Sequence, residues 1–379
     1  MAKLCIKLPP FSPDYSGVAS ALFDLKCLSI LHDASGCTGN YTSYDEPRWY
    51  GAKSPVMCSG LREIDAVLGD DEKLVNNTIK AAEDLNAEII SIIGSPVPMV
   101  IGADTIGIAK EIENATNIPT LGFETTGTRY YDYGIELALE ELAKRFMAKK
   151  DKTLCPSINI LGANLLDFSS LDELDSIKKI VSQLDFEIVS TMPLNLDLNS
   201  LKNSASAWFN VVVTKSGLKL AKYMSEKFNQ PYISYIPIGI NGKKIFEKKL
   251  LALLNKEQLF IKNQVSKDAN ILIIGEQIRS NAIRDSISNN CCVNTLFGLV
   301  EELKMDGDTN LFSEDEIIEA VNSNKYKTVI ADPLILDLIK NPNTKKVAIP
   351  HYVVSSKLYK NKKLNLIGEN LEDFLEKIN

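Results

Sequence analysis

The sequence predicts an α/β protein made of three doubly wound, Rossmann-like domains, each built on a parallel sheet. Three observations carry this prediction. The chain has 379 residues, and because single hydrophobic cores stop growing near about 250 residues, two or three domains are expected. Short β-rich runs alternate with amphipathic stretches, and the alternation restarts twice. Hydrophobic content of 45% with 24% charged residues is typical of a well-packed soluble protein.

The first block of alternation lies within residues 88–124. The apolar runs EIISIIG and IPTLGFE flank ADTIGIAKEIENA, whose apolar residues recur at helical spacing. This order is typical of parallel strands joined by a crossover helix.

The same rhythm restarts at SINILGAN (157–164) and again at NILIIGEQ (270–277). Charged, polar stretches, KKDKT and SKDA, precede these two runs and mark the boundaries. The predicted domains are 1–150, 151–267 and 268–379.

Charge and hydropathy exclude several classes of partner. The net charge is -7 and the basic residues are dispersed in short pairs, so nucleic acid is not an expected partner. The longest apolar runs are interrupted by glycine and proline and are too short to cross a bilayer. Residues 1–10 lack the apolar core of a signal peptide, so we expect a cytoplasmic protein that does not enter membranes.

Common catalytic motifs are absent from the sequence. It contains no GxGxxG for a dinucleotide, no GxxxxGK[ST] for a nucleotide phosphate and no GxSxG for a serine nucleophile. The two histidines are about three hundred residues apart, which excludes a histidine-rich zinc site. Ligands of open α/β sheets bind beyond the carboxyl ends of strands. The loops expected to hold chemistry are therefore 94–98, 124–134, 162–167 and 349–353.

The seven cysteines form no CxxC pair, and structural disulfides are not expected in the cytosol. Buried free thiols are the default interpretation, which we apply to Cys27, Cys155, Cys291 and Cys292. Cys37 differs, because it lies in HDASGCTGN among small residues that let a bulky inorganic group approach the backbone. A thiolate there suits iron, although an ordinary loop cysteine is the competing interpretation.

Four stretches, in order, resemble a known family: SGVASALFDLKCLSILHDASGC, PVMCSGLREIDAVLGDDEKL, IISIIGSPVPMVIGAD and FNVVVTKSGLKLAKYMSEKFNQPYISYIPIGI. They are similar to nitrogenase component 1 and its relatives, which include cofactor-assembly scaffolds, dark-operative protochlorophyllide reductase and the nickel-tetrapyrrole reductive cyclase. The resemblance covers most of residues 12–240. It implies three α/β domains of the nitrogenase component 1 type.

The resemblance implies that Cys37 is a ligand of an iron-sulfur cluster, which this family places between two related subunits. It also implies that a separate ATP-dependent iron protein supplies the electrons, so that ATP acts only through this partner. The cluster expected is a four-iron four-sulfur one at a subunit interface. The second subunit is either another copy of the chain or a sister component 1 subunit.

Other ligand positions of the family are changed in this chain. The resemblance places the upstream cysteine near Ser12, the next near Ser95 or Pro96, and the molybdenum-cofactor cysteine near Thr214. We therefore expect no molybdenum cofactor. Since a cubane cluster usually needs four thiolates or substitutes, a symmetric dimer would need a second ligand from each chain. Cys58 in VMCSG is the nearest candidate and Cys5 a remote one, while a strand entering the core is the alternative interpretation of PVMCSG.

Three more features are candidates for cluster orientation or catalysis. His32 would orient the cluster loop through hydrogen bonds or be an ordinary buried histidine. His351 follows a strand of the third domain and would be a ligand or a proton donor. Arg129 and Tyr130 lie in ETTGTRYYDYG, where an arginine can bind a carboxylate and a tyrosine can donate a proton, or the segment only leads into a helix.

The resemblance, taken with these observations, implies an oxidoreductase that takes low-potential electrons from an iron protein and reduces an unsaturated substrate. A non-catalytic scaffold for metallocluster or cofactor assembly is the alternative. Substrate identity and homomeric or heteromeric assembly cannot be read from the sequence. The resemblance implies that the iron protein docks above the cluster, which brings Arg48 and Trp49 close to the docking surface. The alternative is that Trp49 packs under its own domain.

Overall fold

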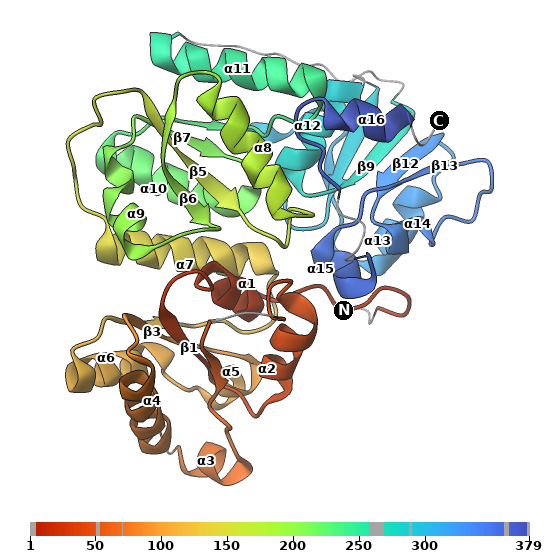
Figure 1. Cartoon of the computed structure of the whole chain (residues 1–379). Coiled ribbons are helices and arrows are strands. Elements are labelled where there is room, and N and C mark those ends of the chain that lie inside the picture. Colours follow the sequence, from red (N-terminus) through yellow and green to blue (C-terminus); the bar gives the residue numbers. More distant parts are fainter. Residues whose placement is uncertain are drawn as a thin grey trace. The chain divides into compact units, whose positions relative to one another are not determined.

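The computed structural model describes residues 5–50, 54–69, 71–257, 269–287, 290–359 and 364–376 (Figure 1). Its contacts divide the chain into two compact units. The small unit comprises Ser12–Ala148 and Ser190–Ser204, and the large unit comprises Met1–Phe11, Lys149–Val189 and Ala205–Asn379. Each unit is described by itself.

A four-stranded parallel sheet in the order β2-β1-β3-β4 is the centre of the small unit. Its strands are β1 (Cys27–Leu31), β2 (Val56–Cys58), β3 (Ile89–Ile93) and β4 (Thr120–Phe123). All five residues of β1 and of β3 are buried, as expected for central strands covered on both faces. Because the strands are parallel, the loops that follow them all emerge at one edge of the sheet.

Two helix pairs pack in the small unit. Helices α4 (Glu72–Leu85) and α6 (Thr105–Thr116) contact each other and share an apolar cluster with β1 and β3. Helices α1 (Asp14–Ala21) and α7 (Tyr131–Phe146) cross closely. Glycine allows this approach, because a Cβ at Gly17 or Gly134 would overlap the backbone of the other helix. The remaining elements are α2 (Gly36–Asn40), a π-helix (Tyr41–Asp45), α3 (Glu63–Leu68), α5 (Pro96–Ile101) and α9 (Leu198–Asn203).

The large unit contains two sheets. The first has the strand order β6-β5-β7-β8. The chain adds β6 on one side of β5 and then crosses over to add β7 and β8 on the other side, which is the doubly wound arrangement. Its strands are β5 (Ser157–Ala163), β6 (Glu187–Pro193), β7 (Phe209–Val212) and β8 (Tyr232–Ser234). Its helices are α8 (Leu171–Ser182), α10 (Leu218–Phe228) and α11 (Gly239–Asn255), with 3-10 turns at Ser204–Ser206 and Lys215–Gly217.

The second sheet of the large unit has the order β11-β10-β9-β12-β13, again with parallel strands. Its strands are β9 (Ile271–Gly275), β10 (Cys291–Thr295), β11 (Thr309–Asn310), β12 (Thr328–Ala331) and β13 (Lys345–Ala348). Its helices are α12 (Gln277–Ile287), α13 (Glu314–Val321), α14 (Pro333–Leu336), α15 (Tyr352–Ser355) and α16 (Asn370–Glu376), with 3-10 turns at Glu301–Leu303 and Ser356–Tyr359.

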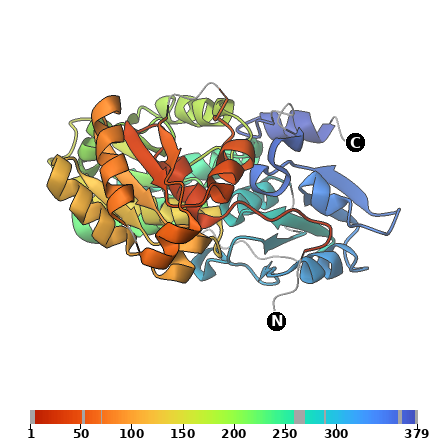
Figure 2. The ribbon, with the colours of Figure 1, turned by 90° about the horizontal axis from the view of Figure 1, so that it is seen from below.

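The N-terminal segment belongs to the large unit. Figure 2 shows this red segment running alongside residues coloured cyan and blue. The Glu314 carboxylate, at the start of α13, accepts the backbone N–H groups of Ile6, Lys7 and Leu8 at 2.7–2.8 Å. These three hydrogen bonds tie the segment to the second sheet of the large unit.

Three parallel sheets confirm the predicted fold class. The predicted boundary after residue 267 lies outside the described residues, and the three-domain division stays a prediction. Cys27, Cys291 and Cys292 are buried as predicted, but the prediction for Cys155 was wrong, because this thiol is exposed in the segment before β5. No helix in the described part of the chain is long and apolar enough to span a membrane.

Candidate functional site

The loop that carries Cys37 leaves the small-unit sheet at the end of β1 and is held by Asp33. One carboxylate oxygen of Asp33 accepts the backbone N–H groups of Ser35 (2.9 Å) and Thr38 (3.0 Å). Ser35 itself has a φ of 127°, which lets the chain turn into α2. Cys37 therefore lies in the first turn of α2, at the carboxyl edge of the sheet.

The Cys37 thiol is half-buried, and the side chains of Tyr15, Ser95 and Asp33 lie near it. Burial raises the pKa of this thiol, and the neighbouring Tyr15 opposes the rise. A thiolate ligand in this position would thus meet a polar environment on the protein side.

Cys58 is the last residue of β2, an edge strand with no buried residue. Its thiol lies 3.3 Å from the Asp33 carbonyl oxygen, and the Gly60 N–H donates to its sulfur at 3.3 Å. The segment does form a strand, as the alternative interpretation expected, but none of the residues of β2 is buried in the core. The Asp33 carbonyl oxygen contacts the Cys58 thiol, and the Asp33 carboxylate holds the turn that carries Cys37, so the loops after β1 and β2 converge on one residue.

His32 is buried directly after β1, and its side chain connects this strand end to Ser59, directly after β2. Burial lowers the pKa of His32. Its Nδ1 lies 2.9 Å from the Ser59 hydroxyl, which donates to the Asp33 carbonyl at 3.1 Å. His32 thus acts on the cysteine loop through Ser59 and Asp33.

The hydroxyls at the changed ligand positions make internal hydrogen bonds. Ser12 donates to an Asp45 carboxylate oxygen (2.9 Å), and Ser95 donates to the His32 carbonyl (2.8 Å). Thr214, in the large unit, donates to the Gly162 carbonyl at 2.6 Å. All three residues are buried, so each hydroxyl proton is used within the protein.

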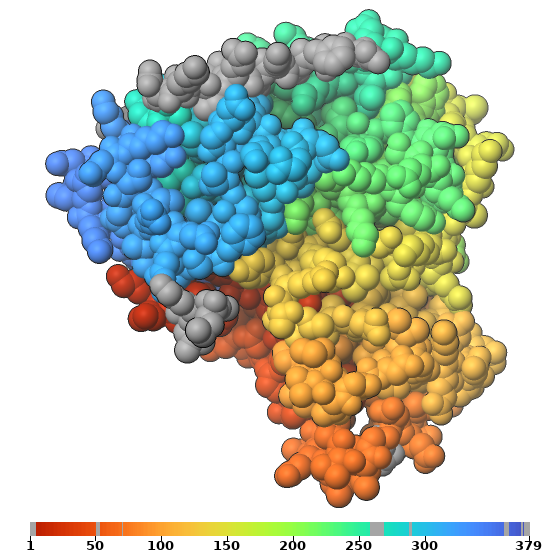
Figure 3. All heavy atoms as spheres, turned by 180° about the vertical axis from the view of Figure 1, so that it is seen from behind, coloured from red at the N-terminus to blue at the C-terminus, as the bar shows by residue number. Residues whose placement is uncertain are grey.

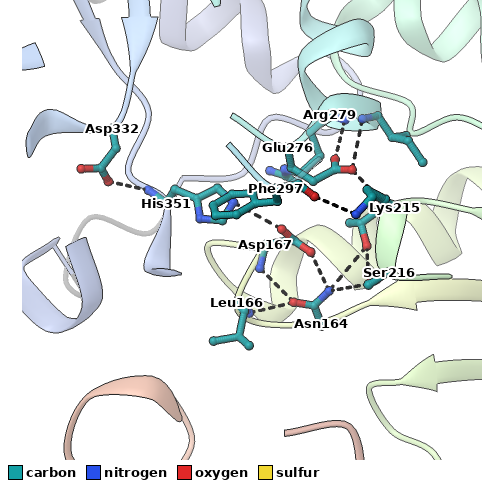
Figure 4. A network of polar contacts seen from close by, with 12 residues as sticks. Asn164, Leu166, Asp167, Lys215, Ser216, Glu276, Arg279, Phe297, Asp332 and His351 are labelled. Atoms are coloured by element: carbon teal, nitrogen blue, oxygen red, sulfur yellow. Dashed lines mark hydrogen bonds and ion pairs between the residues drawn. The ribbon is translucent and has the colours of Figure 1, made fainter. Parts of the chain in front are cut away.

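A second polar site lies in the large unit, at the carboxyl ends of strands from both of its sheets (Figure 4). Glu276 follows β9, and its carboxylate accepts the backbone N–H groups of Lys215 and Arg279, each at 2.8 Å. Lys215 begins the 3-10 turn before α10 and Arg279 lies in the first turn of α12. One buried carboxylate therefore connects the helix starts of the two sheets.

Asp167 and His351 complete this buried network. Asp167, in the loop after β5, accepts a hydrogen bond from Asn164 (2.7 Å), and its other carboxylate oxygen lies 3.3 Å from His351 Nε2. Burial and the neighbouring Asp167 carboxylate raise the pKa of Glu276 to about 7. The pair of carboxylates can therefore hold a proton near neutral pH, next to an imidazole.

The position of His351 is fixed from two sides. Its ring packs against Phe297 at a tilt of 35°, with 5.1 Å between ring centroids, and its backbone N–H donates to Asp332 at 2.8 Å. Asp332 follows β12 and also accepts the Ser355 hydroxyl at 2.7 Å. Figure 4 shows the imidazole between Asp332 and Asp167. The network thus presents His351 at its outer end, where the side chain is 12% exposed.

Comparison with known proteins now places this architecture in a family. The model of nitrogenase component 1 type oxidoreductases matches residues 14–269. The chain belongs to this family.

Relatives of the chain include one of the subunits of light-independent protochlorophyllide reductase. This subunit in Crocosphaera subtropica is 24% identical over 214 residues, which are 54% of this chain and 42% of the relative. Its counterpart in Porphyra purpurea is 27% identical over 211 residues, 53% of this chain and 42% of the relative. The matched part therefore spans about two fifths of the length of these curated relatives.

Solved structures share the fold across the whole chain. A structure of nitrogenase Cp1 at pH 6.5 has a TM-score of 0.72 at 14% identity and covers 100% of this chain and 95% of its own. A second, at pH 5, has a TM-score of 0.71 at 16% identity, with 100% and 90% covered. At this identity the similarity shows the fold and no more.

Arg129 and Tyr130, two other predicted site residues, belong to the small unit, whereas His351 belongs to the large unit. Arg129 is exposed, and its guanidinium lies 4.1 Å from the ring centroid of Tyr133. Tyr130 is 37% exposed and directly precedes α7, so the segment does lead into a helix. The remote candidate Cys5 is exposed, in the N-terminal segment of the large unit.

Arg48 and Trp49 are both half-buried, and their place at a docking surface stays a prediction. The Arg48 guanidinium binds Glu46 (2.7 Å) and Asp24 (3.2 Å) and lies 4.0 Å above the Phe23 ring, which leaves 14% of the side chain exposed. Trp49 packs edge-on against Tyr41, with 6.1 Å between ring centroids. Both side chains have partners within the small unit.

Sequence reasoning missed four residues of these sites: Tyr15, Asp33, Asp167 and Glu276. A signal existed for two of them, since Asp167 lies in a loop expected to hold chemistry and Glu276 directly follows the apolar run NILIIG. An acidic residue at the carboxyl end of a buried strand is a usable signal for a site.

Proposed function

We propose that this chain is the substrate-reducing subunit of a nitrogenase-like reductase. It would hold an iron-sulfur cluster through Cys37 at an interface with a second subunit and receive electrons from an ATP-dependent iron protein. The observation that carries the proposal is that the loops holding Cys37 and Cys58 converge on Asp33, at the carboxyl edge of the small-unit sheet. Family membership supports it.

The donor set fits a cluster that is shared rather than held by one chain. Thiolates are the ligands that iron-sulfur clusters prefer, and a cubane needs four of them or substitutes. Among the described residues, no three His, Cys, Asp or Glu side chains form a metal-binding group. Two chains that each give Cys37 and Cys58, or one such chain with a sister subunit, would complete the set. When bound, the cluster would supply one-electron transfer at low potential.

A second subunit has apolar surface available near the cysteine loops. Helix α3 begins five residues after β2 and exposes Ile64, Val67 and Leu68, each at 61% or more. Helix α5 begins three residues after β3, and Val100 on it is 77% exposed. Figure 3 shows the orange segment that includes α3 standing out from the surface of the small unit. Exposed apolar side chains of this kind are typical of interaction sites.

Reduction of a double bond consumes two electrons and two protons, and the large unit has the groups to supply protons. His351 would pass a proton to the substrate, and Asp167 would hold the imidazole in place through the 3.3 Å contact with Nε2. Glu276, with its pKa raised to about 7, would hold a proton in reserve. Within the small unit, the exposed Arg129 and its neighbour Tyr130 stay candidates for binding a carboxylate.

The test is iron binding by cysteine variants of the full chain, reconstituted without oxygen with ferrous iron and sulfide. We expect a brown wild-type protein with iron and sulfide in near-equal amounts, and a Cys37→Ala protein that loses most of both. The control is Cys155→Ala, which removes an exposed thiol from the large unit and should keep its iron. Unchanged iron in Cys37→Ala would reject the proposal.

A further inference from the structure

We propose that the N-terminal strap, residues 5–11, positions the His351 imidazole by placing Phe11 against Phe297. Phe11 acts through Phe297 and is therefore a positioning residue. The inference rests on the proposed function in one respect, since the proton that His351 would give to the substrate belongs to that proposal. It deepens the proposal by naming the segment that sets the geometry of the proton donor.

The strap is fastened to the large unit by one carboxylate. Glu314, the first residue of α13, accepts the backbone N–H groups of three successive residues at 2.7–2.8 Å: Ile6, Lys7 and Leu8. These hydrogen bonds, that of Ile6 first, lower the pKa of the Glu314 carboxyl, and hydrogen bonds to an ionised acceptor are the strong ones. Leu8 is also buried. Because terminal segments stay poorly ordered unless they are tied down, this fastening gives the strap a fixed place.

Two prolines join the fastened residues to Phe11. Residues 8–11 read LPPF, and the ring of a proline fixes its backbone φ at about −65°. Consecutive prolines form a stiff, extended segment rather than a flexible linker. The place at which Glu314 holds Leu8 therefore determines where Phe11 lies.

Phe11 meets the Phe297 ring edge-on. The ring centroids are 5.9 Å apart with 69° between the ring planes, an arrangement that aromatic pairs favour. Phe11 is half-buried and Phe297 is buried. The His351 ring also packs against Phe297, as Figure 4 shows. The Phe297 ring is thus in contact with the strap and with the imidazole at once.

The backbone of Phe297 is held by other groups. Its carbonyl accepts the Lys215 ammonium at 2.7 Å, and its N–H donates to the Thr295 hydroxyl oxygen at 3.3 Å. The backbone N–H of His351 is held as well. With both backbones fixed, the ring contacts remain to set the orientation of the imidazole. Loss of the Phe11 ring should therefore turn the two other rings and leave the fold intact.

NMR can follow the His351 ring directly, because the chain has only two histidines. Full-length, metal-free protein with carbon-13-labelled histidine would be recorded at about pH 9, where imidazoles are neutral. The ring current of Phe297 displaces the His351 Hε1 signal from the position of free histidine, and loss of this signal in His351→Gln assigns it. In Phe11→Ala we expect the His351 signal to move toward the free position. The His32 signal, from the small unit, should stay.

Phe228→Ala is the matched control. Phe228, at the end of α10, is also half-buried in the large unit and also makes an edge-on contact, with 6.0 Å between its ring centroid and that of Tyr223. This variant should leave both histidine signals unchanged. Phe11→Tyr keeps the ring at the strap and should give the wild-type spectrum.

A second variant covers the case in which Phe11→Ala fails to fold. Glu314→Gln removes the charge that accepts the strap, so the His351 signal should move in the same direction. Glu319→Gln, which changes an exposed glutamate on the same helix, should have no effect.

A wild-type His351 signal in folded Phe11→Ala or in Glu314→Gln would overturn the inference and leave the proposed function standing. Equal shifts in Phe228→Ala would also overturn it. A wild-type chain that takes up no iron would reject the proposed function, while the histidine signals, recorded without a cluster, would still decide whether the strap positions His351.

Discussion

Asp33 is the residue on which the two candidate ligand loops converge. Its carboxylate holds the turn into α2 through the backbone of Ser35 and Thr38, and its carbonyl oxygen accepts from Cys58 and Ser59. A loop held by several backbone contacts keeps a ligand in one geometry, which lowers the reorganisation that binding requires. Asp33 therefore helps to set the spacing of the two candidate ligands, although it is not itself a ligand.

Glu276 leads to a prediction on the pH dependence of stability. Its pKa is raised from 4.5 to about 7 in the folded chain, so the folded state binds a proton that the unfolded state releases. The stability that this proton contributes is complete below about pH 4.5 and is lost as pH rises through about 7. Glu276→Gln cannot titrate. The variant should gain roughly 2 kcal/mol relative to wild type between pH 5 and pH 8.

Urea unfolding of the metal-free chain at pH 5, 6, 7 and 8 measures this difference. The control is Glu226→Gln, which changes an exposed glutamate on α10 and should follow the wild-type pH dependence. If the unfolding free energies of wild type and Glu276→Gln depend on pH in the same way, Glu276 has the same pKa in the folded and unfolded chain, which would contradict the prediction.

At the residue scale, the sequence was enough to select residues whose neighbours along the chain mark them. It was not enough to select residues that depend on contacts between distant segments. Cys37 could be selected because small residues surround it directly after an apolar run. The contact of Asp167 with His351, and the place of Tyr15 near Cys37, involve segments that only the fold brings together. The spacing of residues along the chain does not encode such pairs, so the buried carboxylates and the tyrosine were not selected.

At the scale of elements, the close crossing of α1 and α7 sets where Tyr15 lies. A Cβ on Gly134 would overlap the Asp14 carbonyl oxygen on α1. Gly134→Ala should therefore force the helices apart and cost roughly 3 kcal/mol of unfolding free energy. Chemical denaturation of the metal-free protein provides the measurement.

Gly39→Ala is the matched control for this prediction. A Cβ there meets no atom within 4 Å, and the position is helical, so stability should change by less than about 0.5 kcal/mol or rise slightly. Equal stability of the Gly134→Ala and Gly39→Ala proteins would contradict the account of the helix crossing.

The elements with strong periodicity could be predicted, and the short ones could not. The helix expected in ADTIGIAKEIENA is α6, which begins at Thr105 because the Asp104 side chain caps it by accepting from Gly107. The π-helix after α2 and the short strand β2 have no periodic signal, since five and three residues are too few to show one. These irregular elements are the ones that carry or border the two thiols.

At the scale of the whole molecule, the chain forms two compact units although it has three sheets. The large unit holds its two sheets together through buried charges. Besides Glu276, Arg279 of α12 binds Glu173 of α8 at 2.9 Å, and both side chains are buried. Buried interactions between sheets leave no pattern along the chain, so sequence reasoning could mark only the restarts of the alternation, and its three-domain division stays a prediction.

Electron transfer to the cluster tests the central claim most directly. The reconstituted full chain would be mixed without oxygen with the ATP-dependent iron protein of its own organism, reduced beforehand with dithionite, and cluster absorbance would be followed by stopped flow. The account predicts fast bleaching only when both the iron protein and MgATP are present, and none with Cys37→Ala. Equal bleaching rates with and without the iron protein and MgATP would contradict it.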